Sequence, residues 1–174
     1  MTFLTYDALI STNEFAKVLA KEGAAHGTAV LARRQTKGRG QYEREWHSPE
    51  GGMWLSIILQ EVSFEKEPMT IALGKKIVVA LEEITKQKFS IKLPNDILYN
   101  GKKVCGILTE LVTQGARTYG VVGIGLNVNN KQFPPHLMAH ATSLVLIDGV
   151  ERDIKDIAIK ITMCILEGND VNSD

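Results

Sequence analysis

Cysteine is scarce in this sequence, with only Cys105 and Cys164 among 174 residues. The two lie far apart and have neither metal-site nor redox-pair spacing, so a disulfide framework is not expected. Two unpaired thiols are typical of a reducing compartment, and we predict a cytoplasmic protein.

Excess charge and long apolar runs are also lacking. Twenty Lys and Arg balance twenty Asp and Glu, so no overall field attracts nucleic acid or an anionic membrane. No apolar run is long enough to cross a bilayer, and the first residues do not resemble a signal peptide. We therefore expect neither nucleic acid nor membrane as a partner. The length and 44% hydrophobic content predict a single domain over residues 1–174.

Several motifs of known chemistry are missing. The sequence contains neither a Walker A motif nor G-x-G-x-x-G, and no Ser-His-Asp or Cys-His arrangement stands out locally. His136 and His140 have the i,i+4 spacing of metal ligands, but no third ligand is visible. No metal site is therefore predicted from a protein motif.

Periodicity predicts helices and strands in both halves of the chain. Ser11 and Glu14 form a capping box for a helix ending near Gly23, with Ile10 and Phe15 at the positions of a hydrophobic staple. Strands are expected over 28–34, 53–60 and 89–93, and helices over 68–86 and 154–168.

Two turn signals follow residue 95, at Asn100-Gly101 and at Gln114-Gly115. They join apolar runs into an antiparallel meander. The predicted fold class is α+β, with a mixed, largely antiparallel sheet flanked by helices rather than a doubly wound parallel sheet. The exposed edge of the meander could pair across a two-fold axis, which would give a homodimer.

Residues 33–46, "RRQTKGRGQYEREW", join two of the predicted strands. Gly38 and Gly40 allow the backbone to approach a ligand, and the basic side chains can donate to phosphate or carboxylate. The basic residues are Arg33, Arg34, Lys37, Arg39 and Arg44. The alternative is a solvated surface loop.

The strand "VVGIGLNV" has one face of Val122, Ile124, Leu126 and Val128. Its other face carries Gly123, Gly125 and Asn127, so a flat ligand could lie on bare backbone there. Close packing by another element is the alternative.

Three short polar segments complete the candidates. In "KLPND", Asn95 and Asp96 follow a strand stopped by proline, although Pro-Asn-Asp is also an ordinary turn. Lys103 is predicted to share a strand face with Cys105, Ile107, Thr109 and Leu111, at the rim of a semi-apolar surface or as a snorkelling edge lysine. "STN" (11–13) caps a helix, and helix N-termini also bind polar or anionic groups.

Taken in order, "STN", "RRQTKGRGQYEREWHSPEGG", "KLPND", "KKVCGILTE" and "GIGLNVN" resemble the catalytic domain of biotin protein ligases. Each motif alone is weak, whereas five in family order are specific, and the resemblance covers roughly residues 5–145. It implies a class II synthetase/biotin synthetase-like fold. It also implies a two-step reaction in which biotin and ATP, with Mg²⁺, form biotinyl-5′-AMP. Biotin then passes to a lysine of a biotin carboxyl carrier protein, such as a subunit of acetyl-CoA carboxylase.

The resemblance also assigns roles to residues. The implied catalytic residues are Arg39, which would meet the biotin carboxylate and the α-phosphate, Lys103, which would hold developing charge, and Asp96, which would orient or deprotonate the carrier lysine. The implied biotin contacts are Ser11, Thr12, Asn13, Gln35, Gly38, Arg39, Gly40, Gln41, Lys103 and Gly106. The implied ATP and adenylate contacts are Arg39, Trp46, Asn95, Lys103, Gly123, Gly125 and Asn127. The loop would fold over the ligand and shield a reactive anhydride from water, with Trp46 as its packing anchor or simply as a core residue.

The sequence departs from the family pattern in places. Gln41 replaces a second arginine that many members have, at a position that influences how firmly the adenylate is retained, and Leu93 replaces the usual tryptophan. We expect no N-terminal DNA-binding domain, and the usual C-terminal small β-barrel domain is expected to be absent. Two alternatives remain: a lipoate or octanoate transferase of the same superfamily, and a non-catalytic biotin or biotinyl-adenylate binding module.

Overall fold

The computed structural model describes residues 1–60 and 68–167. Within these residues the strands form one mixed sheet in the order β1-β2-β3-β7-β6-β5-β4. The strands are β1 (Phe3–Leu9), β2 (Thr28–Gln35), β3 (Gly52–Gln60), β4 (Ser90–Lys92), β5 (Asp96–Tyr99), β6 (Lys102–Gln114) and β7 (Arg117–Asn127). Only β1 and β2 pair in parallel, and the other neighbours are antiparallel. The predicted α+β class is therefore confirmed.

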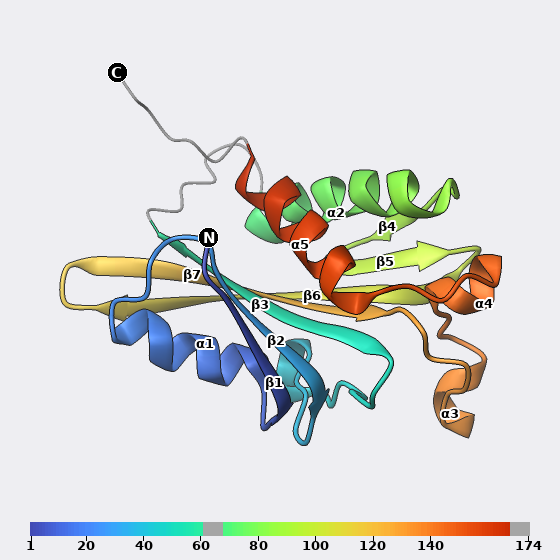
Figure 1. Cartoon of the computed structure of the whole chain (residues 1–174), viewed down its shortest axis with the longest axis horizontal. Helices are drawn as coiled ribbons and strands as arrows, with labels where there is room; N and C mark the ends of the chain where they lie inside the picture. The colour runs from blue at the N-terminus through green and yellow to red at the C-terminus, as the bar shows by residue number, and fades with distance from the viewer. Residues whose placement is uncertain (61–67, 168–174) are drawn as a thin grey trace.

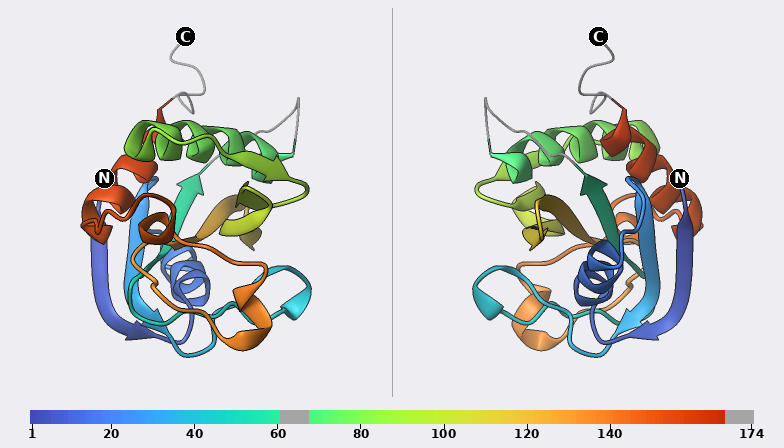
Figure 2. Two further views of the ribbon diagram at one scale, coloured as in Figure 1. Left: turned by 90° about the vertical axis from the view of Figure 1, so that its right-hand side faces the viewer. Right: turned by 90° about the vertical axis from the view of Figure 1, so that its left-hand side faces the viewer.

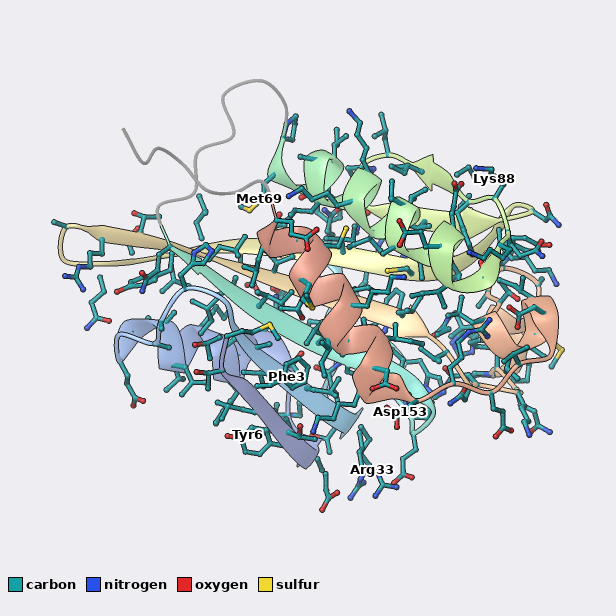
Figure 3. The ribbon with its side chains drawn as sticks, turned by 45° about the horizontal axis from the view of Figure 1, so that its top comes forward. Phe3, Tyr6, Arg33, Met69, Lys88 and Asp153 are labelled. Atoms are coloured by element: carbon teal, nitrogen blue, oxygen red, sulfur yellow. The ribbon has the colours of Figure 1, made fainter. Side chains whose placement is uncertain are left out.

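Helices cover both faces of this sheet. They are α1 (Thr12–Lys21), the 3₁₀ turn η1 (Gln41–Glu43), α2 (Met69–Thr85), α3 (Pro135–Met138), α4 (Leu144–Asp148) and α5 (Ile154–Leu166). Figure 1 and Figure 2 show α2 and α5 together over one face and α1 over the other. In Figure 3, Asp153 marks the start of α5, where its carboxylate caps the backbone N–H groups of Lys155 and Asp156.

The alternation of β7 divides the core into two parts. Val122, Ile124 and Leu126 face the larger core, under α2 and α5. Val121 and Tyr119 face the smaller core, under α1. Beyond Val121, the α1 side of β7 carries glycines instead of apolar side chains, so the smaller core stops there.

The other predicted elements are also confirmed in outline. The strands over 28–34, 53–60 and 89–93 and the helix over 68–86 correspond to β2, β3, β4 and α2. At the hairpin turn, Asn100 and Gly101 have positive φ of 47° and 79°, the backbone that Asn-Gly favours. Gly168, where the last helix was predicted to stop, lies outside the described residues.

Sequence reasoning missed the edge strand β1. It pairs with β2 through Phe3↔Ala29 to Leu9↔Gln35 and is only partly buried, so its apolar alternation is weak. The predicted hydrophobic staple between Ile10 and Phe15 was wrong, because Phe15 packs on the missed strand β1 instead. Ile10 is 64% exposed, whereas Phe15 packs edge-on against Tyr6 of β1, with ring centroids 4.9 Å apart.

The predicted face of Lys103 was also wrong. Ile97 of β5 pairs with Cys105 of β6, and the next residue, Leu98, pairs with Lys103. Val104 therefore has no partner in β5 and is the extra residue of a β-bulge. Val104 and Cys105 both lie in the larger core. The bulge therefore moves Lys103 from the face of Cys105 and Ile107 to the face of Gly106, on the α1 side.

Candidate functional site

A cavity of about 550 Å³ opens on the α1 side of the sheet. The N-terminus of α1, the loop after β2, the turn between β4 and β5 and the segment 133–141 surround it. Of the predicted site residues, those that line it are Ser11, Thr12, Asn13, Gln35, Arg39, Gly40, Gln41, Trp46, Asn95, Asp96, Lys103, Gly106, Gly123, Gly125 and Asn127. Gly38 alone does not line it. It is buried at the base of the loop, where its carbonyl accepts from the Trp46 N–H at 2.9 Å.

Three glycines form the floor of this cavity. Gly106 of β6 pairs with Gly125 of β7, and Gly123 lies two residues along the same face. A Cβ atom on Gly125 would lie 2.5 Å from Nε1 of Trp46, and one on Gly106 would lie 2.8 Å from the same ring. The predicted face of glycines is present, and the alternative of close packing holds in this structure, because Trp46 and Asn13 lie against it. A ligand on this face stays a prediction.

Trp46 closes the floor from the loop side. Its ring stands edge-on to Trp54 of β3, with centroids 6.5 Å apart, and its carbonyl accepts from Ser48 Oγ at 2.9 Å. Among the described residues, its buried indole N–H has no hydrogen-bond partner. An acceptor atom of a ligand placed there would satisfy that donor.

A hydrogen-bond network builds the end of the cavity at α1. Ser11 caps the helix by accepting from the Glu14 N–H at 3.5 Å. Gln35 Oε1 accepts from the backbone N–H of Thr12 at 2.7 Å, and Ser56 Oγ donates to Asn13 Oδ1 at 2.6 Å. Because Thr12, Asn13 and Ser56 are buried, this end offers polar groups without bulk water.

Arg39 pairs with carboxylates at the edge of this network. Its guanidinium contacts Glu14, Glu110 at 3.3 Å and Glu43 at 3.5 Å. A side-chain hydrogen bond from Lys17, with a smaller contribution from Arg39, holds the pKa of Glu14 below its usual value. Burial opposes the charge of Lys17, but its bonds to Glu14 and Glu110 raise its pKa overall. Both Nη groups of Arg39 are therefore paired with carboxylates, whereas its buried Nε–H has no hydrogen-bond partner among the described residues.

Lys103 and Asp96 form a second ionic group, across β6 and β5. Lys103 Nζ lies 2.6 Å from Asp96 Oδ1 and 4.7 Å from the centre of the Trp46 ring. The backbone of Lys103 is also clamped, because its N–H donates to the His140 carbonyl at 2.7 Å and its carbonyl accepts from the Thr142 N–H at 2.9 Å. A rigid strand thus places the ammonium beside the glycine floor.

Two predicted ligand-binding amides are partly committed to the protein. Asn95 Nδ2 donates to the Ile107 carbonyl at 3.0 Å, which ties the turn before β5 to β6. Asn127 Nδ2 donates to the Thr142 carbonyl at 3.0 Å, which holds the segment that clamps Lys103. Both residues line the cavity, but these two nitrogens support the backbone.

The charge of the cavity wall suits an anion. Its basic side chains are Arg39, Arg44, Lys92 and Lys103, and its carboxylates are Glu45 and Asp96. Burial raises the pKa of the nearby Cys105 thiol to about 12, so that thiol is no nucleophile at neutral pH. Within residues 1–60 and 68–167, no three His, Cys, Asp or Glu side chains gather as a metal site. None of the helices in that part of the chain combines the length and apolarity needed to span a bilayer.

Sequence reasoning missed three residues of the site. The sequence could have indicated Ser56, because it is the only hydroxyl residue in the apolar strand "MWLSIILQ". Trp54, in the same strand, lines the cavity and donates Nε1–H to the Pro49 carbonyl at 2.9 Å. Glu110 ends the motif "KKVCGILTE", but only the fold brings it to α1 and Arg39.

The chain is similar to known proteins over most of its length. The model of the biotin/lipoate A/B protein ligase family matches residues 7–127. The bifunctional ligase/repressor BirA of Bacillus subtilis is 42% identical over 165 residues, which are 91% of this chain and 51% of that protein. The biotin--[acetyl-CoA-carboxylase] ligase of Paracoccus denitrificans is 37% identical over 68% of this chain and 51% of its own length.

A solved structure has the same fold as this chain. The biotin protein ligase of Aquifex aeolicus, in complex with biotin and ATP, superposes with a TM-score of 0.86 and 38% identity. That match covers 95% of this chain and 69% of the Aquifex chain. The class II synthetase-like fold implied by the motifs is thereby confirmed. The chain spans about half the length of the curated relatives described above. On the family match and this likeness, the chain belongs to the biotin/lipoate A/B protein ligase family.

Proposed function

We propose that this chain activates biotin with ATP to biotinyl-5′-AMP and then transfers biotin to a lysine of a biotin carboxyl carrier protein. One observation carries the proposal: a single cavity has a buried hydrogen-bonding end at Thr12, Asn13 and Gln35 and a cationic end at Lys103, joined by a glycine floor. Biotin has matching parts, because its ureido head hydrogen-bonds, its tail is apolar and its far end is a carboxylate.

The same geometry favours biotin over lipoate. Asn13 Oδ1 accepts from Ser56 Oγ and can accept one further hydrogen bond. The dithiolane head of lipoate has no N–H group, so it would leave that capacity unused. A site built to hydrogen-bond its substrate rejects an analogue that lacks those bonds, since buried polar groups are then unsatisfied. We therefore place the lipoate or octanoate transferase second.

In the first step, a biotin carboxylate oxygen attacks the α-phosphorus of ATP, and the bond to the β-phosphate breaks as pyrophosphate leaves. Two anions must meet for this attack. We assign Lys103 and Arg39 to offset their repulsion and to hold the charge that develops on phosphorus. Arg39 reaches this position by leaving Glu14, Glu43 and Glu110, which bind it in the structure.

In the second step, the carrier lysine amine attacks the acyl carbon, and the bond to the phosphate oxygen breaks as AMP leaves with the electron pair. The amine must lose a proton, and we assign Asp96 to orient it and to accept that proton. Asp96 lies 2.6 Å from Lys103, so the same pair can serve both steps.

The assignments of ligand contacts follow from position in the cavity. We propose that Ser11, Thr12, Asn13 and Gln35 contact the head of biotin, and that Lys103 contacts its carboxylate. The loop residues Gly38, Gly40 and Gln41 and the floor residue Gly106 are proposed as further biotin contacts. Trp46, Asn95, Gly123, Gly125 and Asn127 are proposed as adenylate contacts.

We propose that Mg²⁺ accompanies ATP, because Mg²⁺ usually keeps several waters and binds phosphates with one or two carboxylates. Glu45 and Asp96, the carboxylates of the cavity wall, suit that part. When bound, the ion would neutralise phosphate charge. We also propose a cytoplasmic location, since both cysteines are free, and a homodimer through the sheet edge at β4. With balanced charge, we propose no nucleic-acid or membrane partner.

Transfer is tested with an isolated carrier domain. Incubated with this chain, biotin and MgATP, the domain is expected to gain the mass of one biotinyl group, as measured by intact-protein mass spectrometry. A carrier domain with its target lysine changed to arginine is the control and should gain nothing. An unmodified lysine-containing carrier would contradict the transfer step.

A further inference from the structure

Glu110 of β6 makes no proposed contact with the ligand, yet it joins α1 to the loop. Its Oε2 accepts from Asn13 Nδ2 at 2.8 Å. Its Oε1 lies 3.0 Å from Lys17 Nζ and 3.3 Å from Arg39 Nη2. The side chain is 24% exposed, so most of it is shielded from water. Glu110 faces the cations of Lys17 and Arg39, and its ionised carboxylate can accept hydrogen bonds but cannot donate one.

An acceptor-only neighbour determines which way the Asn13 amide points. An asparagine carries donors on one side and an acceptor on the other, and its neighbours select between the two orientations. Because Glu110 and the Leu108 carbonyl, at 3.4 Å, can only accept, Nδ2 must face them. Oδ1 then faces Ser56, whose hydroxyl donates to it at 2.6 Å.

The orientation of Asn13 matters because its acceptor stands over the floor of the cavity. A Cβ atom on Gly123 would lie 2.3 Å from Asn13 Oδ1. Asn13 and Gly123 both line the cavity, and Ser56 occupies only one of the two lone-pair directions of Oδ1. The remaining direction can accept one hydrogen bond from a ligand that lies on the floor.

Resting on the proposed function, we propose that Glu110 is a specificity-determining positioning residue, which holds Asn13 Oδ1 as an acceptor and so selects an acid whose head group carries an N–H donor. It does not touch the ligand. It acts through the amide that does. The ureido N–H groups of biotin meet this requirement, and the dithiolane ring of lipoate does not.

The swap of a single charge for an amide tests this. In Glu110→Gln the new side chain can accept or donate, so only the longer contact with the Leu108 carbonyl still requires Nδ2 on that side, and the orientation of Asn13 is held more weakly. The probes are biotin and its two cyclic carbamate analogues, in each of which oxygen replaces one ureido N–H without changing ring size. Their dissociation constants are measured by calorimetry for the whole chain.

We expect the wild-type chain to prefer biotin over the more weakly bound carbamate by on the order of 100-fold, the effect of losing one buried hydrogen bond and gaining a lone-pair clash. In Glu110→Gln this ratio should fall to about 10 or less. Lys17→Met is the matched control: it removes an ion pair from Glu110 but leaves the acceptor for Asn13, and should keep the wild-type ratio.

A second variant separates orientation from general damage. In Asn13→Asp combined with Glu110→Gln, the carboxylate and the amide exchange places, so position 13 again presents an acceptor over the floor. The double variant should regain most of the preference for biotin. A wild-type ratio in Glu110→Gln, an equal loss in Lys17→Met, or no recovery in the double variant would overturn the role of Glu110. Failure of the wild-type chain to bind biotin would overturn the proposed function as well.

Discussion

Adenylate formation is expected to slow by roughly 1,000-fold when Lys103 is replaced by alanine, the upper range for removing one donor from a developing negative charge. The ammonium stands beside the glycine floor, 2.6 Å from Asp96, on a backbone clamped by His140 and Thr142. The measurement is biotin-dependent pyrophosphate release under single-turnover conditions.

The fold should survive this change. Lys103 and Asp96 are both partly exposed, so loss of their ion pair should cost about 1 kcal/mol of unfolding free energy. Lys102→Ala is the matched control, because Lys102 is the preceding residue of β6 and its side chain is exposed. It should retain the wild-type rate. A Lys103→Ala chain that folds and releases pyrophosphate at that rate would remove Lys103 from the mechanism.

Biotin binding is expected to weaken by about 100-fold in Gly123→Ala. The new methyl group would lie 2.3 Å from Oδ1 and 2.8 Å from Cγ of Asn13, which is 4% exposed and fixed by Glu110 and Ser56. The amide must shift, and a forced fit of this kind costs about 1–3 kcal/mol. Calorimetry measures the dissociation constant, and urea unfolding measures the cost to the fold.

Gly74→Ala provides the control for this glycine substitution. Gly74 lies inside α2, where a Cβ atom would meet only ordinary contacts, 3.5 Å from Ile107 and 3.6 Å from Ile91. Alanine also favours a helix more than glycine does. Gly74→Ala should therefore bind biotin as the wild-type chain does. Equal affinity of the two variants would show that the floor at Gly123 is not part of the binding site.

The elements that sequence reasoning could predict are those with a regular period. In "VVGIGLNV" alternate residues are either apolar or glycine, and this pattern predicts both the larger core and the bare floor. Asn100-Gly101 predicts its turn because both residues tolerate positive φ. The order of five weak motifs then indicated which ligand such a floor would hold.

What sequence reasoning could not predict depends on single insertions and on contacts distant in sequence. Val104 is one extra residue in β6, and it reverses the face on which Lys103 stands. No local pattern marks it. Asn127 stays a predicted ligand contact, but no local pattern indicated that its Nδ2 would support the Thr142 carbonyl, 15 residues away. Glu110 reaches Asn13 only after β6 and α1 pack on the same sheet.

The central claim is that this cavity activates biotin, and pyrophosphate release from MgATP by the purified 174-residue chain tests it most directly. Lipoate is the control acid, and chelation of Mg²⁺ is expected to stop the reaction. We predict release with biotin and none with lipoate. Release with lipoate alone would point to the lipoyl enzyme. Biotin binding without pyrophosphate release would contradict the claim and identify a non-catalytic binding module.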